Sequence, residues 1–186
     1  NAEGSKLSLH NSPGPWRPCL NRAAKGTGPI IIMTHGFKYA PGRDLTCPHT
    51  RIFSTGITPT SAKSTLWLPP LGFGAGDGDE GLAVAFGWDA CGTVWTARKS
   101  AIAAGHKLAD IITQILRVAV DRPIHLIAHS MGGCIGLRAV IEGLPVQAAA
   151  FTGPMWGIHV APHLRYLAHF LAHTMPYFGK GHLLPP

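Results

Sequence analysis

The stretch that most constrains the fold is residues 124–133, which read Ile-His-Leu-Ile-Ala-His-Ser-Met-Gly-Gly. Its first residues are mostly apolar, as in a buried strand, and a helix-like segment follows as far as Glu142. Small residues, Ala128 and Gly132, lie two positions before and two positions after Ser130. A sharp turn that strains the serine backbone crowds its neighbours and needs small residues there. The stretch therefore predicts a strand, a tight turn that carries a serine, and a helix.

A second apolar run lies at residues 29–34, Pro-Ile-Ile-Ile-Met-Thr. Continuous β-branched sequence of this kind is typical of a strand that is buried on both faces of a parallel sheet. His35, Gly36 and Phe37 follow it directly. A glycine lets the backbone turn, so that the next N–H, on Phe37, faces a reacting carbonyl group. The run thus predicts a strand followed by a loop whose backbone N–H groups can donate hydrogen bonds.

The remaining segments alternate in type along the chain. We expect an irregular arm at 1–28, a long connection at 38–81 with a short helix at 58–68, a strand at 82–88, a helix at 94–120, the helix after the serine turn and a strand at 146–151. This alternation predicts an α/β fold, a three-layer α/β/α arrangement with a mostly parallel sheet.

The last segment, residues 158–186, reads as one amphipathic helix after a core at 29–157. Apolar residues recur in it at helical spacing, and histidines fall on another side. One interpretation is a helix packed on the core. The alternative is a lid over an acyl pocket or a helix in peripheral contact with a membrane. The sequence leaves both open.

These motifs together resemble the α/β-hydrolase superfamily. The strand, serine turn and helix at 124–133 look like its nucleophile elbow, although the family usually has glycine at the position of Ala128. The HGFKY motif at 35–39 and the AHSMGG motif are similar to those of a group of bacterial α/β-hydrolase-like proteins. The resemblance implies a partial or minimal α/β-hydrolase fold. It also implies an esterase or lipase-like serine hydrolase that acts on a small-molecule or lipid-like ester.

The resemblance also implies a candidate site. Ser130 is the expected nucleophile, and the N–H groups of Phe37 and Met131 are the expected oxyanion donors. His35 is expected to hold the oxyanion loop, and His129 to line the rim of the pocket. The expected oxyanion and substrate-binding residues are thus Phe37, Met131, His35, Gly36 and His129.

The catalytic acid and base are not evident in the sequence. In this superfamily the order along the chain is serine, then aspartate or glutamate, then histidine. Glu142 is the one carboxylate after Ser130, and at about 1.5 Å per helical residue it lies roughly 15 Å or more from the serine. Three explanations stay open: a truncated hydrolase, a non-catalytic binding or interaction protein with this fold, or a base from an unusual place. The third would combine Asp89 with one of the histidines His159, His163, His169, His173 and His182.

Composition excludes several other classes. The 186 residues carry a formal charge of +7, from 16 basic and 9 acidic residues, but the basic residues are scattered and do not indicate a nucleic-acid site. No apolar run reaches the roughly 18 residues of a transmembrane helix. The four cysteines form no CxxC pair, so we expect free thiols, a cytoplasmic location, and no metal or cofactor.

Overall fold

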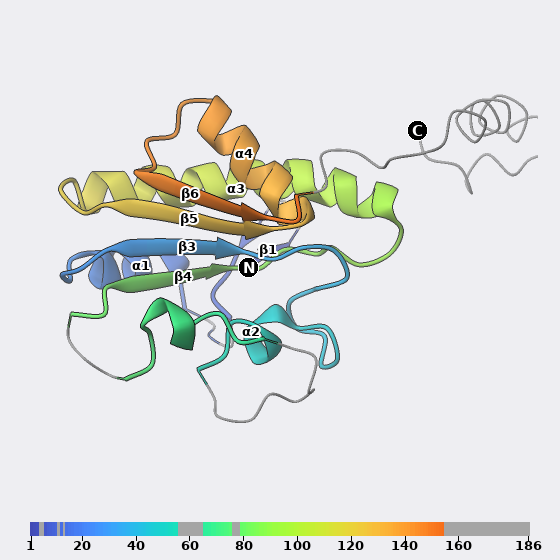
Figure 1. Ribbon diagram of the computed structural model, residues 1–186, viewed down its shortest axis with the longest axis horizontal. Coiled ribbons are helices and arrows are strands. Elements are labelled where there is room, and N and C mark those ends of the chain that lie inside the picture. The colour runs from blue at the N-terminus through green and yellow to red at the C-terminus, as the bar shows by residue number, and fades with distance from the viewer. Residues whose placement is uncertain (4–5, 11, 13, 56–64, 76–78, 155–186) are drawn as a thin grey trace, which may run out of the picture. The chain divides into compact units, whose positions relative to one another are not determined.

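Four parallel strands form the centre of the fold in the computed structural model (Figure 1). They are β3 (Ile30–Thr34), β4 (Leu82–Phe86), β5 (Ile124–His129) and β6 (Ala148–Thr152), in the spatial order β4-β3-β5-β6. The structure describes residues 1–3, 6–10, 12, 14–55, 65–75 and 79–154. The predicted α/β fold with a parallel sheet is confirmed, whereas the amphipathic helix predicted at 158–186 lies outside the described residues.

The register of the sheet brings the ends of its strands together. Thr34 lies opposite Phe86 on one side and Ala128 on the other, and His129 lies opposite Thr152. Because all four strands are parallel, the loops that follow them meet at one edge of the sheet. In sheets of this type ligands bind at that edge, beyond the carboxyl ends of the strands.

Helices cover one face of the sheet. The long helix α3 (Val94–Val118) packs on α4 (Met131–Ile141) and on α1 (Trp16–Ala24). Its fully buried residues, Leu108, Ile112 and Ile115, recur at helical spacing, as the amphipathic pattern predicted. The Thr93 side chain accepts a hydrogen bond of 3.1 Å from the Thr96 N–H, which caps the start of α3.

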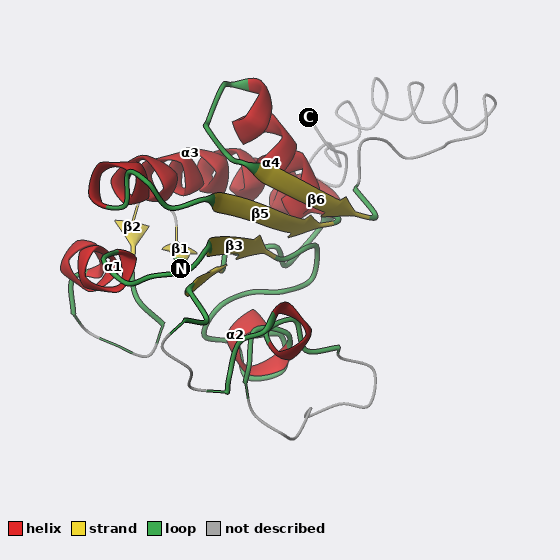
Figure 2. Ribbon diagram, turned by 60° about the vertical axis from the view of Figure 1, so that its left-hand side comes forward, coloured by secondary structure: helices red, strands yellow, loops and turns green. Residues whose placement is uncertain are grey.

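The opposite face is covered by the long connection between β3 and β4 (Figure 2). This segment contains the single-turn helix α2 (Pro48–Arg51) and the 3-10 turn Pro69–Leu71. Its apolar residues pack in one cluster with the sheet, made of Met33, Ile52, Phe53, Leu68 and Phe73. The third layer is therefore present, but it consists mainly of loops. The helix predicted at 58–68 falls mostly outside the described residues, and residues 65–68 are not helical.

The N-terminal segment is not irregular throughout, so that prediction was wrong. Two short strands, β1 (Ala2–Glu3) and β2 (Lys6–Leu7), pair with each other, and α1 follows them. The end of helix α1 binds a guanidinium group from a residue that lies far along the chain. The Arg122 side chain donates to the carbonyls of Ala24 and Gly28, each at 2.8 Å, and the first of these is a carbonyl that the helix leaves free.

None of the helices among the described residues is long and apolar enough to cross a membrane. The four cysteines, Cys19, Cys47, Cys91 and Cys134, form no disulfide.

Candidate active site

Ser130 lies on a strained turn between β5 and α4. Its backbone has φ 55° and ψ −123°, a conformation that costs a residue with a side chain about 1–3 kcal/mol. The Ser130 N–H donates to the Thr152 carbonyl at 2.9 Å, which ties the turn to the end of β6. A Cβ on Gly132 would lie 2.4 Å from the His35 carbonyl oxygen, and Ala128 is fully buried. The residues around Ser130 are therefore small for the steric reason that the sequence indicated.

The loop after β3 lies directly against the serine. A Cβ on Gly36 would come within 2.6 Å of the Ser130 Cβ, so only glycine permits this approach. Within the described part of the chain, neither the Phe37 N–H nor the Met131 N–H donates a hydrogen bond. Met131 is the first residue of α4, where backbone N–H groups are left free and carry partial positive charge. Two unengaged donors thus come from the two segments that flank Ser130.

His35 is completely buried and holds this loop in place. The Trp88 N–H donates to His35 Nε2 at 3.0 Å, so the ring proton is on Nδ1, which donates to the Gly36 carbonyl at 2.9 Å. The Trp88 indole N–H donates a hydrogen bond of 3.1 Å to the His35 carbonyl, and the two rings stack. Burial lowers the pKa of His35 to about 4. With both ring nitrogens engaged, His35 is neutral and has no nitrogen free to accept a proton from Ser130.

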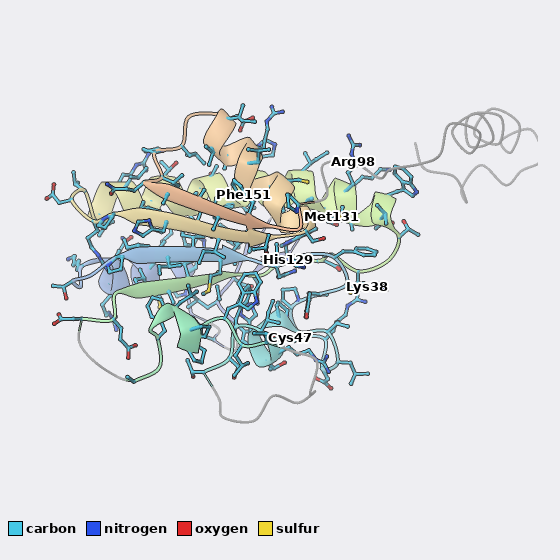
Figure 3. The ribbon with its side chains drawn as sticks, in the orientation of Figure 1. Lys38, Cys47, Arg98, His129, Met131 and Phe151 are labelled. Carbon is cyan, nitrogen blue, oxygen red and sulfur yellow. The ribbon has the colours of Figure 1, made fainter. Side chains whose placement is uncertain are left out.

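His129 lies at the same edge of the sheet, on the surface. Its Nδ1 is 3.0 Å from the Thr152 hydroxyl, and the edge of its ring meets Trp67. Figure 3 shows His129 and Met131 at the carboxyl ends of the strands. The His129 ring packs beside Gly36 and Gly153 and forms no hydrogen bond with Ser130.

The described carboxylates do not complete a triad. Asp89 lies at the carboxyl edge but accepts from the Cys91 N–H at 3.0 Å and pairs with Arg43 at 3.6 Å. Glu142 lies at the opposite end of α4 and pairs with Arg138. Among the residues that the structure describes, no histidine bonded to a carboxylate lies beside Ser130. The downstream histidines, all beyond residue 154, are outside this set.

A cavity of about 290 Å³ lies away from the serine, along the outer edge of β4. Residues of the N-terminal segment and α1 line it, among them Leu9 and Trp16, with the stacked rings of His10 and His49 nearby. None of the candidate site residues lines it. The candidate site is therefore the region around Ser130, where backbone geometry and free donors converge, rather than this cavity.

Sequence reasoning missed the partners that hold the site. Trp88 follows β4, which is the neighbour of the strand that leads to the candidate loop, and Thr152 ends β6, which is the neighbour of the strand that leads to the serine turn. Sequence reasoning singled out neither residue. Their position at a strand end is a usable signal, because the carboxyl ends of parallel strands meet at one edge. Trp67 had no such signal, since it comes from the loop-rich layer.

In this parallel sheet an inner strand leads through a strained serine into a helix. A glycine loop from the neighbouring strand lies beside the serine. This arrangement defines the α/β-hydrolase type. The chain has a fold of this type. Residues 104–184 match the family described as serine aminopeptidase, S33, and over this range the chain is similar to that family. The matched range includes the serine turn and confirms the α/β-hydrolase resemblance. Comparison with curated proteins gave no match.

Proposed function

We propose that the protein is a serine hydrolase that cleaves carboxylic esters with an apolar acyl group. In this proposal the Ser130 Oγ attacks the ester carbonyl, and the N–H groups of Phe37 and Met131 stabilise the oxyanion. The observation that carries the proposal is the strained Ser130 backbone, with two unengaged N–H donors on the adjoining segments. Donors fixed before the reaction need no reorganisation as negative charge develops, and one such donor is worth about 3–4 kcal/mol of the barrier.

The surroundings of Ser130 support an apolar or lipid-like substrate. Met131 is buried beside the serine, and Phe37 and Trp67 are both half-buried in the adjoining loops. Trp67 meets His129, so an aromatic side chain lies near the serine turn on the loop-rich side. Apolar side chains around a few polar donors are typical of small-molecule sites.

Turnover requires a base for the Ser130 proton and an acid to orient that base. His35 is fully engaged with Trp88 and Gly36, and His129 is directed toward Thr152. Neither therefore suits the role of base. The family match continues to residue 184 and includes five histidines beyond residue 154, which are further candidates for the base.

A fluorophosphonate probe tests the nucleophile directly, because it labels only an activated serine. We expect the wild-type chain to be labelled and Ser130→Ala to be unlabelled. Ser8→Ala is the matched control, since Ser8 lines the cavity along β4, which none of the candidate residues lines, and it should label like the wild type. Absence of wild-type labelling, or labelling that survives Ser130→Ala, would contradict the proposal.

A non-catalytic binding protein with this fold is the second candidate. The observation that favours it is the engagement of Asp89 by Arg43 and the Cys91 N–H, which makes this carboxylate, at the carboxyl edge of the sheet, less suited to the role of acid. The two candidates differ in turnover. Equal binding of a 4-nitrophenyl ester to the wild type and Ser130→Ala, with no release of nitrophenol by either, would favour the binding protein.

The free thiols also support a cytoplasmic location, which we include in the proposal. Cys47 is buried and Cys19 is exposed, and neither forms a disulfide. Free exposed thiols persist best in a reducing compartment.

A further inference from the structure

A stripe of exposed apolar and basic residues runs along the first turns of α3. Trp95 is 42% exposed and Ile102 58% exposed, and they lie seven positions apart on the same face of the helix. Arg98 and Lys99, both exposed, occupy the turn between them. The buried stripe of α3, which includes Ala97, Ala104 and Leu108, faces the other way. These four side chains are therefore turned outward together.

A third exposed apolar residue lies on the loop after β3. Leu45 is 79% exposed and lies on the tight turn closed by the bond of 2.9 Å from the Thr46 N–H to the Arg43 carbonyl. Arg43 pairs with Asp89, and the Thr46 hydroxyl lies 3.9 Å from the Cys91 sulfur. The turn is thus held against residues 89–91, which lead directly into the start of α3.

The same region borders the serine turn. Lys38 is exposed, immediately follows Phe37, and donates its N–H to the Ala90 carbonyl at 2.9 Å. Helices α3 and α4 both begin at the carboxyl edge of the sheet, since each follows a strand of the parallel set. Figure 3 places Lys38 and Arg98 at the same end of the molecule as His129 and Met131.

The charge of this face is positive. Among the described residues its carboxylates are Asp89, which is paired with Arg43, and the exposed Asp44. Lys38, Arg98 and Lys99 form no ion pair with another described residue, so cations exceed anions here. A second copy of the chain would bring the same positive charge to such a face, and repulsion disfavours that partner.

We propose that this face, formed by Leu45, Trp95, Ile102, Lys38, Arg98 and Lys99, docks on a surface of anionic lipid. Tryptophan and aliphatic side chains bind at the boundary between headgroups and acyl chains, and basic side chains attract anionic headgroups. Docking in this orientation would present the Ser130 edge to the lipid. The surface itself does not depend on turnover, so lipid binding is measured separately from the labelling of Ser130.

The test is co-sedimentation of the full chain with vesicles of phosphatidylcholine, alone or with phosphatidylserine added. We expect binding to the anionic vesicles that weakens as salt is raised. Arg98→Gln with Lys99→Gln should weaken it by about fivefold for each charge removed, because a basic residue near an anionic membrane contributes about 1 kcal/mol. Trp95→Ala and Ile102→Ser should weaken it as well.

Matched controls lie at the other end of the molecule. Val120→Ser removes an aliphatic side chain that is 76% exposed, and Arg117→Gln removes an exposed charge from the last turn of α3. Both variants should bind vesicles like the wild type. Absence of wild-type binding, binding unaffected by salt, or equal losses in the controls and the α3 variants would overturn the proposal. A change of oligomeric state in Trp95→Ala would also overturn it, because the face would then be a contact between copies.

Discussion

At the scale of single residues, Gly36 and Ser130 approach each other closely in the candidate site. The gap between the two backbones has no room for a side chain, since an added Cβ would lie 2.6 Å from the Ser130 Cβ and 3.1 Å from the His129 carbonyl oxygen. Neither of these atoms is the flexible end of a side chain. The loop position therefore depends on glycine at this site.

Gly36→Ala is expected to displace the loop that carries the Phe37 N–H. Loss of one oxyanion donor lowers the rate by about a hundredfold or more, and fluorophosphonate labelling should slow accordingly. Gly105→Ala is the matched control, because a Cβ there would meet Ile135 only at 3.7 Å and lies inside α3. The control should label normally and should gain up to about 1 kcal/mol in stability. Normal labelling of Gly36→Ala would show that the loop takes no part.

The sequence predicted the tight packing around Ser130 better than it predicted the contacts between strands. Ser130 and Gly36 were identifiable because each follows a long apolar run, and the steric need for small neighbours can be stated from a turn alone. The bond between Trp88 and His35 was not predictable, since it joins two strands whose separation along the chain is 53 residues. Only the strand order, which no single segment encodes, brings them together.

At the scale of elements, helix α1 depends on one arginine. Arg122 donates to the carbonyls of Ala24, Thr27 and Gly28 at 2.7–2.8 Å, and thus fixes the end of α1 to the turn before β5. Local sequence contains no equivalent cap for the last turn of α1. This explains why the arm was expected to be irregular: the stabilising side chain lies almost a hundred residues further along the chain.

Arg122→Ala is expected to lower the free energy of unfolding by about 2 kcal/mol, because hydrogen bonds from a charged donor contribute about 1.5–3 kcal/mol each and these are partly exposed. Urea denaturation measures the change. Arg117→Ala, which removes an exposed arginine of α3, should stay within about 0.5 kcal/mol of the wild type. Equal stability of Arg122→Ala and Arg117→Ala would show that the bonds at the end of α1 contribute nothing.

At the scale of the whole molecule, the buried His35 and the partly buried His49 connect stability to pH. Burial lowers the pKa of His35 to about 4, and burial together with the neighbouring His10 lowers the pKa of His49 to about 3. The ordinary value is 6.5, so below that pH the unfolded chain binds protons that the folded chain does not. Their contribution is fully present above pH 6.5 and is lost as the pH falls toward 4 and then 3.

The slope of stability against pH tests this directly. The free energy of unfolding should decrease as the pH is lowered from 6 to 4. Each histidine should account for at most about 1.4 kcal/mol of this decrease per pH unit. His35→Gln and His49→Gln should each reduce the slope by up to that amount. Ser8→Ala is the control, because it removes no titratable group, and its slope should match the wild type. An unchanged slope in both buried-site variants would contradict the prediction.

The fold class was predictable because alternation of apolar strands with an amphipathic helix admits few arrangements. The composition of the third layer was not predictable. Its apolar residues, such as Phe53 and Phe73, are separated by glycine and proline and show no period, although they pack in one cluster against Met33. Periodicity reveals regular elements, and a layer built from loops has none.

The register of β3 also has a consequence for synthesis of the chain. Ile30 pairs with Leu82 on one side and with Ile124 on the other, so both neighbours of this strand are made after it. At about 5–20 residues per second, an apolar strand waits on the order of 10 s for its second partner. During that time Ile30–Met33 is an unpaired edge with high β-propensity, the kind of segment that chaperones cover and that aggregates when left exposed. Production in the cell is therefore expected to depend on how soon β5 emerges.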